Sequence, residues 1–197
     1  MLRVTLMVLI SALVTSFKEK FYSMTKRFLQ NLTLLLSVLI TAPVFAGGVY
    51  QQPADFIHQV FNDKPPKPSI LWLEKDIKKQ IAKILGHNYN GLRVRYWQKN
   101  KMSAWVLEEI GKEKLITVGI IINNNQIDRV KILAFRESRG WEVRHDFFTD
   151  QFKQAKLVSG NNLSQSIDNI SGATLSVRAV KKLAKIALLL DLEISKK

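Results

Sequence analysis

The sequence predicts an α+β fold in which an antiparallel sheet of about four or more strands is flanked by helices. Four strand-like runs follow one another with short connections, as antiparallel neighbours do. The runs cover residues 92–98, 104–110, 115–122 and 127–135. A helical pattern precedes them over residues 69–85, and a second one follows them over residues 174–192.

The first predicted helix has its apolar residues at helical spacing, at Ile70, Leu73, Ile77, Ile81 and Ile84. A serine stands where it can cap the N-terminus, and a glycine follows the last turn as a stop. These two residues are Ser69 and Gly86. Further along, three consecutive asparagines, residues 123–125, separate the last two strand runs. Asparagine tolerates a positive φ, so they predict a tight hairpin.

The last predicted helix separates an apolar stripe from a basic face. The stripe contains Val177, Val180, Leu183, Ala184, Ala187, Leu188 and Asp191, and the opposite face contains Lys181, Lys182 and Lys185. Such a helix packs one side on the sheet and leaves the other in water.

Residues 1–46 have the composition of a targeting segment. In order come two basic residues, an apolar run and a small-x-Ala cleavage site: Lys26 and Arg27, residues 32–40, and residues 44–46. We expect a signal peptide cleaved after Ala46, with translation starting at Met24 and residues 1–23 a mis-assigned extension. The alternative is an uncleaved anchor, for which the apolar run falls short of the ~20 residues of a good span.

Residues 47–68 contain four of the five prolines and predict an extended leader and linker, so the folded domain is expected to cover residues 69–197. The formal charge of the chain is +14. Residues 1–46 hold five basic residues and one acidic residue, so the remainder carries +10. In an exported protein this charge favours anionic membranes or acidic proteins, and we expect no nucleic-acid partner. Without cysteine, haem attachment through CxxCH and thiol catalysis are excluded.

The common catalytic motifs give no assignment. The chain has no GxSxG, Walker or GxGxxG motif. Its three histidines lack metal-ligand spacing, so no metal site is expected. The segment 135–148 gathers arginines, glutamates and aromatics, and it fits either a solvated charged hairpin or a loop that faces a ligand.

Small and hydroxyl-bearing residues precede the last helix: Ser171, Gly172, Ala173 and Thr174. In one interpretation they form an ordinary cap, where Ser171 or Thr174 accepts a hydrogen bond from the first-turn amides. In the other, Gly172 and Ala173 leave the backbone uncovered for a phosphate, which a helix N-terminus favours. Thr174 then stands where its hydroxyl can be esterified.

The nine residues DNISGATLS, from Asp168 to Ser176, resemble the flavinylation motif of FMN-binding domains, such as the periplasmic subunits of Na+-translocating quinone reductase and Rnf complexes. The resemblance implies FMN joined covalently to Thr174 by a phosphoester, installed by a periplasmic flavin transferase. It makes Ser171, Gly172 and Ala173 motif residues and Asp168 the upstream acidic residue.

The preceding hairpin and its Glu-x-x-Gly loop also resemble this family, so that the resemblance covers about residues 115–190. Glu137-Ser138-Arg139-Gly140 stands where better-known members have Glu-Thr-Pro-Gly. Glu137, Gly140 and Trp141 are therefore further expected FMN-binding residues. Trp141, Val143 or Phe147 is expected to flank the flavin ring.

We therefore expect an exported, periplasmic flavoprotein, with the outer face of the inner membrane as one location. It would pass electrons between membrane-bound or periplasmic redox partners, as a carrier more than as a stand-alone enzyme. Two alternatives stay open. One is a flavin-free basic binding module, and the other is a flavin reductase with its own substrate, which would need a nicotinamide site that no Rossmann signature supports.

Overall fold

The computed structural model describes residues 17, 18, 20–27 and 48–196. The chain divides into two units, Met1–Val44 and Phe45–Lys197. In the first unit the described residues are helical, and most of the expected signal peptide lies outside the described residues. In the parts of the chain that are described, no helix has both the length and the apolar character needed to cross a membrane.

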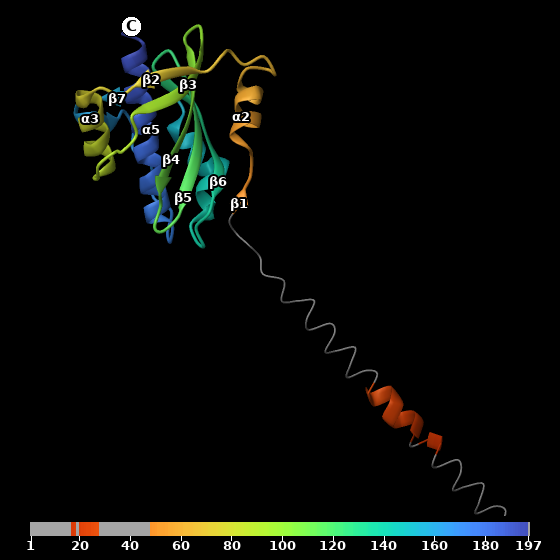
Figure 1. The fold of residues 1–197 in the computed structure, drawn as a ribbon. Coiled ribbons are helices and arrows are strands. Elements are labelled where there is room, and N and C mark those ends of the chain that lie inside the picture. Colours follow the sequence, from red (N-terminus) through yellow and green to blue (C-terminus); the bar gives the residue numbers. More distant parts are fainter. Residues whose placement is uncertain (1–16, 19, 28–47, 197) are drawn as a thin grey trace, which may run out of the picture. The chain divides into compact units, whose positions relative to one another are not determined.

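The second unit is built on a six-stranded sheet in which every neighbouring pair is antiparallel (Figure 1). Its strands in sheet order are β1 (Gly48–Val49), β6 (Gln126–Phe135), β5 (Leu115–Asn123), β4 (Met102–Ile110), β3 (Arg93–Lys99) and β2 (Ser69–Trp72). The α+β prediction is confirmed, and the four predicted strand runs correspond to β3 to β6. A separate pair joins β7 (Leu157–Val158) to β8 (Asn162–Leu163).

The asparagine hairpin is also confirmed. Asn123 pairs with Gln126 across β5 and β6. The two residues between them, Asn124 and Asn125, have φ of 51° and 59°. A two-residue connection with positive φ at both positions matches the twist of the flanking strands.

The helix predicted over residues 69–85 is wrong in its first part. Its first four residues form β2, where Leu71 lies opposite Val94 of β3. Leu71 is buried while its neighbours Ile70 and Trp72 are exposed, an alternation of period two that belongs to a strand. The helix α3 (Lys75–Leu85) therefore has Glu74 at its N-cap and not Ser69. It ends at Gly86, with φ of 77°, as predicted.

Residues 47–68 differ from the extended leader that the prolines predicted. β1 pairs with the end of β6, and α2 (Pro53–Val60) follows it. Phe56 and Ile57 are buried against one face of the sheet. Gly119 of β5 makes room for this contact, because a Cβ there would lie 2.6 Å from the Phe56 ring. The prolines left a short amphipathic helix intact, so the folded unit begins before Ser69.

The opposite face of the sheet carries α5 (Thr174–Ile194), which packs on β4 and β5, while α3 packs on α5 (Figure 1). The larger hydrophobic core lies between this helix pair and the sheet. The chain from β6 to β7 forms short helical turns: η1 (Trp141–Arg144), α4 (Asp146–Thr149) and η2 (Asp150–Phe152). One further turn, η3 (Ser159–Asn161), connects β7 to β8. Thus segment 135–148 is no simple hairpin.

Candidate functional site

The candidate site lies at the start of α5. Thr174 is the first helical residue and Ala173 is the N-cap, and no described side chain accepts a capping hydrogen bond from the first-turn amides. The ordinary-cap interpretation is therefore wrong. Gly172 turns the chain into the helix with φ of 80°, and a Cβ built there would have no atom within 4 Å. The backbone in front of the helix is thus open, as the sequence suggested.

The first turn of α5 leaves its amides available. The N–H groups of Thr174, Leu175 and Ser176 have no hydrogen-bond partner in the described part of the chain, and the first internal bond runs from Val177 to Ala173. The first turn also contains no acidic residue. Unpaired amides and the positive end of the helix dipole together attract an anion.

The side chain of Thr174 is exposed, and its hydroxyl makes no hydrogen bond to the described residues. It opens on a pocket of about 390 Å³ between α3 and α5. The pocket is lined by Ile84, Asn169, Thr174, Arg178, Lys181, Lys182 and Lys185. We call its four cationic residues, Arg178, Lys181, Lys182 and Lys185, the basic stripe. None of the described lining residues is acidic.

Three members of the basic stripe are held in place by neighbours. Lys181 donates to the carbonyl oxygen of Ile167 (3.1 Å), and Lys185 lies 3.4 Å from the side-chain oxygen of Asn162. Lys182 forms an ion pair with Glu109. Arg178, one turn beyond Thr174, has no hydrogen bond or ion pair among the described residues. Its guanidinium charge is free to face a ligand.

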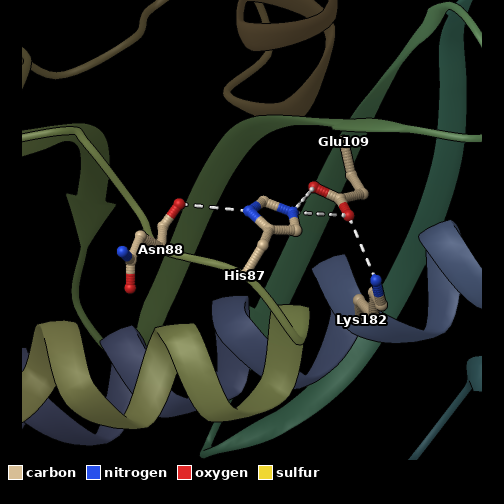
Figure 2. A network of polar contacts seen from close by, with 4 residues as sticks. All are labelled: His87, Asn88, Glu109 and Lys182. Atoms are coloured by element: carbon tan, nitrogen blue, oxygen red, sulfur yellow. Dashed lines mark hydrogen bonds and ion pairs between the residues drawn. The ribbon is translucent and has the colours of Figure 1, made fainter.

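Glu109 of β4 links the pocket to an exposed histidine (Figure 2). Its carboxylate is only 7% exposed and lies 3.2 Å from both the Lys182 ammonium and the Nε2 of His87. The other ring nitrogen of His87 contacts the carbonyl oxygen of Asn88. The Asn88 carbonyl, and after it Glu109, raise the pKa of His87. Sequence reasoning missed this network, because its members stand far apart along the chain.

The Glu-x-x-Gly loop packs directly on the start of α5. Gly140 has φ of 86°, and a Cβ there would lie 2.7 Å from the Ser176 hydroxyl oxygen and 3.3 Å from Ala173. Glycine is therefore required both for its conformation and for this close approach. The structure thus places the Glu-x-x-Gly loop against the segment that precedes α5, two regions that the sequence had indicated separately.

Glu137, the first residue of the Glu-x-x-Gly loop, binds this loop to the turn between β4 and β5. Its Oε1 accepts hydrogen bonds from the amides of Lys112, Glu113 and Lys114, at 2.5, 2.7 and 2.9 Å. Burial raises the pKa of Glu137, but these three amides more than offset it, so that the pKa is lowered. Gly111 allows the approach, because a Cβ there would lie 2.9 Å from Oε1. Glu137 thus fastens the turn between β4 and β5.

The aromatic residues form a second group beside Gly140. Trp141 is half-buried, and the Arg144 guanidinium stacks 4.9 Å from its ring centroid. Phe147 is 61% exposed and stacks on His145, whereas Val143 is fully buried and presents no surface to a ring. Asp168 is exposed, and its N–H donates to Gln151. Among the described residues, neither Trp141 nor Asp168 lines the pocket of Thr174.

Comparison with known families finds one match, which spans the residues just described. Residues 111–189 match the model of the FMN-binding domain. Searches of curated proteins and of solved structures each gave no match. The matched segment runs from the turn that Glu137 fastens into the last third of α5, so that it includes Gly140, Thr174 and the basic stripe.

Proposed function

We propose that the chain, whose residues 111–189 match the FMN-binding domain family, is a flavin-binding protein that carries FMN covalently on Thr174 and serves as an exported electron carrier. The flavin supplies the redox chemistry when bound, and the chain supplies attachment and surroundings. Covalent attachment suits an exported carrier, because a dissociable cofactor would be lost by dilution.

The observation that carries this proposal is the setting of the Thr174 hydroxyl. It is exposed, it has no hydrogen-bond partner among the described residues, and it opens on a pocket. The hydroxyl of a threonine at a helix start commonly accepts a hydrogen bond from a first-turn backbone amide instead. Here the amides and the hydroxyl are both left available, which suits a phosphoester whose remaining oxygens accept hydrogen bonds from them.

Charge supports the same assignment. A phosphodiester between Thr174 and the flavin ribityl chain keeps one negative charge. Arg178 stands one turn away without a partner, and the three lysines of the basic stripe border the same pocket. Hydrogen bonds from cations to phosphate oxygens are stronger than neutral ones. The site therefore fits the phosphate end of FMN.

Attachment needs a flavin nucleotide donor and a periplasmic flavin transferase. The Thr174 oxygen forms the new bond to phosphorus and loses its proton, while the bond from phosphorus to the leaving group of the donor breaks. The unhindered approach over Gly172 and the exposed side chain of Thr174 leave room for the transferase. The signal-peptide pattern of residues 24–46 supports export, and a membrane-bound or periplasmic redox protein would be the partner.

The proposal is tested by co-expression with a flavin transferase and denaturing electrophoresis. The wild-type band should fluoresce as a flavin, and its mass should rise by that of FMN less one water. Thr174→Val should abolish both signals, whereas Ser166→Ala, which removes an exposed hydroxyl just before the motif, should keep the fluorescent band. Fluorescence that persists in Thr174→Val refutes the assignment.

A further inference from the structure

The basic stripe gathers four cations on one side of α5 at a cost to the helix. Arg178 and Lys182 are four residues apart, as are Lys181 and Lys185, while Arg178–Lys181 and Lys182–Lys185 are three apart. Like charges at these spacings repel each other and destabilise a helix. A solvated helix face usually mixes the two signs. The concentration of positive charge therefore indicates an anionic partner in the pocket.

The neighbouring acidic residues do not neutralise this charge. Glu109 is the carboxylate that contacts the stripe, and it lies beside Lys182 with a second contact to His87. Lys181 and Lys185 are held by neutral oxygen atoms, and Arg178 has no partner among the described residues. Around Thr174, three of the four cations therefore remain without a counter-charge in the described part of the chain.

We propose that the basic stripe stabilises the reduced, anionic state of FMN and so raises its reduction potential. This inference rests on the proposed attachment at Thr174. In the reaction, oxidised FMN takes up two electrons from an external donor and one proton from water, which leaves one negative charge on the ring system. The oxidised ring is neutral, so nearby cations favour the reduced state selectively.

The tether strengthens the argument. An ester at Thr174 holds the phosphate at the pocket and keeps the flavin ring within the length of the ribityl chain from the basic stripe. The stripe begins one helical turn from the attachment oxygen. Glu109 reduces the field of Lys182, since the two charges are only 3.2 Å apart. Removing a cation and removing this carboxylate should therefore shift the potential in opposite directions.

The test measures the reduction potential of the covalently loaded protein by spectroelectrochemistry, with an electrode as the electron donor. Arg178→Gln should shift the potential to a more negative value. We expect the ratio of reduced to oxidised flavin at a fixed applied potential to fall roughly threefold to tenfold. The shift should shrink in concentrated salt, which screens exposed charges.

The matched control is Lys101→Gln, which removes one exposed positive charge at the other end of α5. Lys101 lies in the turn before β4, next to Asn124, and the end of α5 that this region contacts is about 25 Å from Thr174 along the helix axis. Its potential should equal that of the wild type. An equal shift in Lys101→Gln and Arg178→Gln would overturn the proposal, because net charge alone would explain it.

Glu109→Gln should shift the reduction potential in the direction opposite to that of Arg178→Gln. It keeps the shape of the side chain but removes the charge that offsets Lys182, so the potential should become more positive. A thermal melt confirms that the variant is folded. Loaded protein whose potential is the same in all variants would refute the role of the stripe and leave attachment intact. A wild type without bound flavin would refute both the attachment and this inference.

Discussion

The polar groups at the two ends of α5 differ in their hydrogen bonding. Near the C-terminal end, Asp191 is buried and accepts hydrogen bonds from Ser103 (2.5 Å) and Asn125 (3.2 Å). The Ser103 hydroxyl in turn accepts one from the indole of Trp105 (2.8 Å). At the N-terminal end, the Thr174 hydroxyl and three amides lack partners among the described residues.

This difference separates fold from function within one helix. Buried polar groups that find partners fix how elements pack, because leaving one unpaired is costly. The Asp191 network fastens α5 to β4 and to the β5–β6 hairpin. Polar groups left open at the surface contribute little to folding and remain available to a ligand. Changes at one end should therefore alter stability, and changes at the other should alter flavin loading.

The largest effect on stability is expected from Ser103→Ala. It removes the hydroxyl between Asp191 and Trp105, so that the Trp105 indole loses its partner and the buried Asp191 carboxylate keeps only Asn125. This should cost about 3 kcal/mol of unfolding free energy. Ser171→Ala, at the open end of the helix, should cost less than about 0.5 kcal/mol. Urea unfolding monitored by circular dichroism measures both. Equal losses would remove the distinction between the ends.

Gly140 and Gly172, both near the N-terminal end of α5, form a matched pair because both have a positive φ. Gly140→Ala should cost about 2 kcal/mol, since it adds a clash with Ser176 to the strain of a positive φ. Gly172→Ala has the same strain but free space around it, so about 1 kcal/mol is expected. Unfolding curves of the two variants test this order. A larger loss for Gly172→Ala would show that Gly140 is not held against α5 as described.

The sequence predicted what depends on neighbours along the chain. The strands β3 to β6 follow local alternation, the asparagine turn follows backbone preference, and the start of α5 follows from the small residues before Thr174. It could not predict what depends on distant partners. Ser69–Trp72 fits both helical and strand spacing, and only pairing with β3 decides between them. Glu109 and Lys182 meet across the fold, so no local pattern marks their contact.

The carboxyls of Asp191 and Glu137 should give the stability of the protein opposite slopes with pH. Burial raises the pKa of Asp191, so its stabilising contribution is present below its ordinary value of 3.8 and is lost as pH rises through the folded-state pKa. The pKa of Glu137 is lowered, so its contribution is present above 4.5 and is lost as pH falls through the folded-state pKa.

Melting temperatures from about pH 3 to pH 7 separate these contributions. The advantage of the wild type over Asp191→Asn should decrease as pH rises, because asparagine resembles the protonated acid. Its advantage over Glu137→Gln should increase as pH rises, because the ionised carboxylate receives the three amides. Parallel profiles for the two variants would contradict the opposite environments of these groups.

The smallest effect concerns His87, which is 55% exposed and contributes little to stability. Its pKa is raised by the Asn88 carbonyl and then by Glu109, so Glu109→Gln should lower that pKa while leaving it under the influence of Asn88. Glu193→Gln, near the other end of α5, should leave it unchanged. Titration of the His87 ring by NMR measures both. If Glu109→Gln leaves the pKa of His87 unchanged, the Glu109 carboxylate interacts electrostatically with Lys182 and not with His87. The net charge of the groups beside Thr174 would then not depend on pH near neutrality.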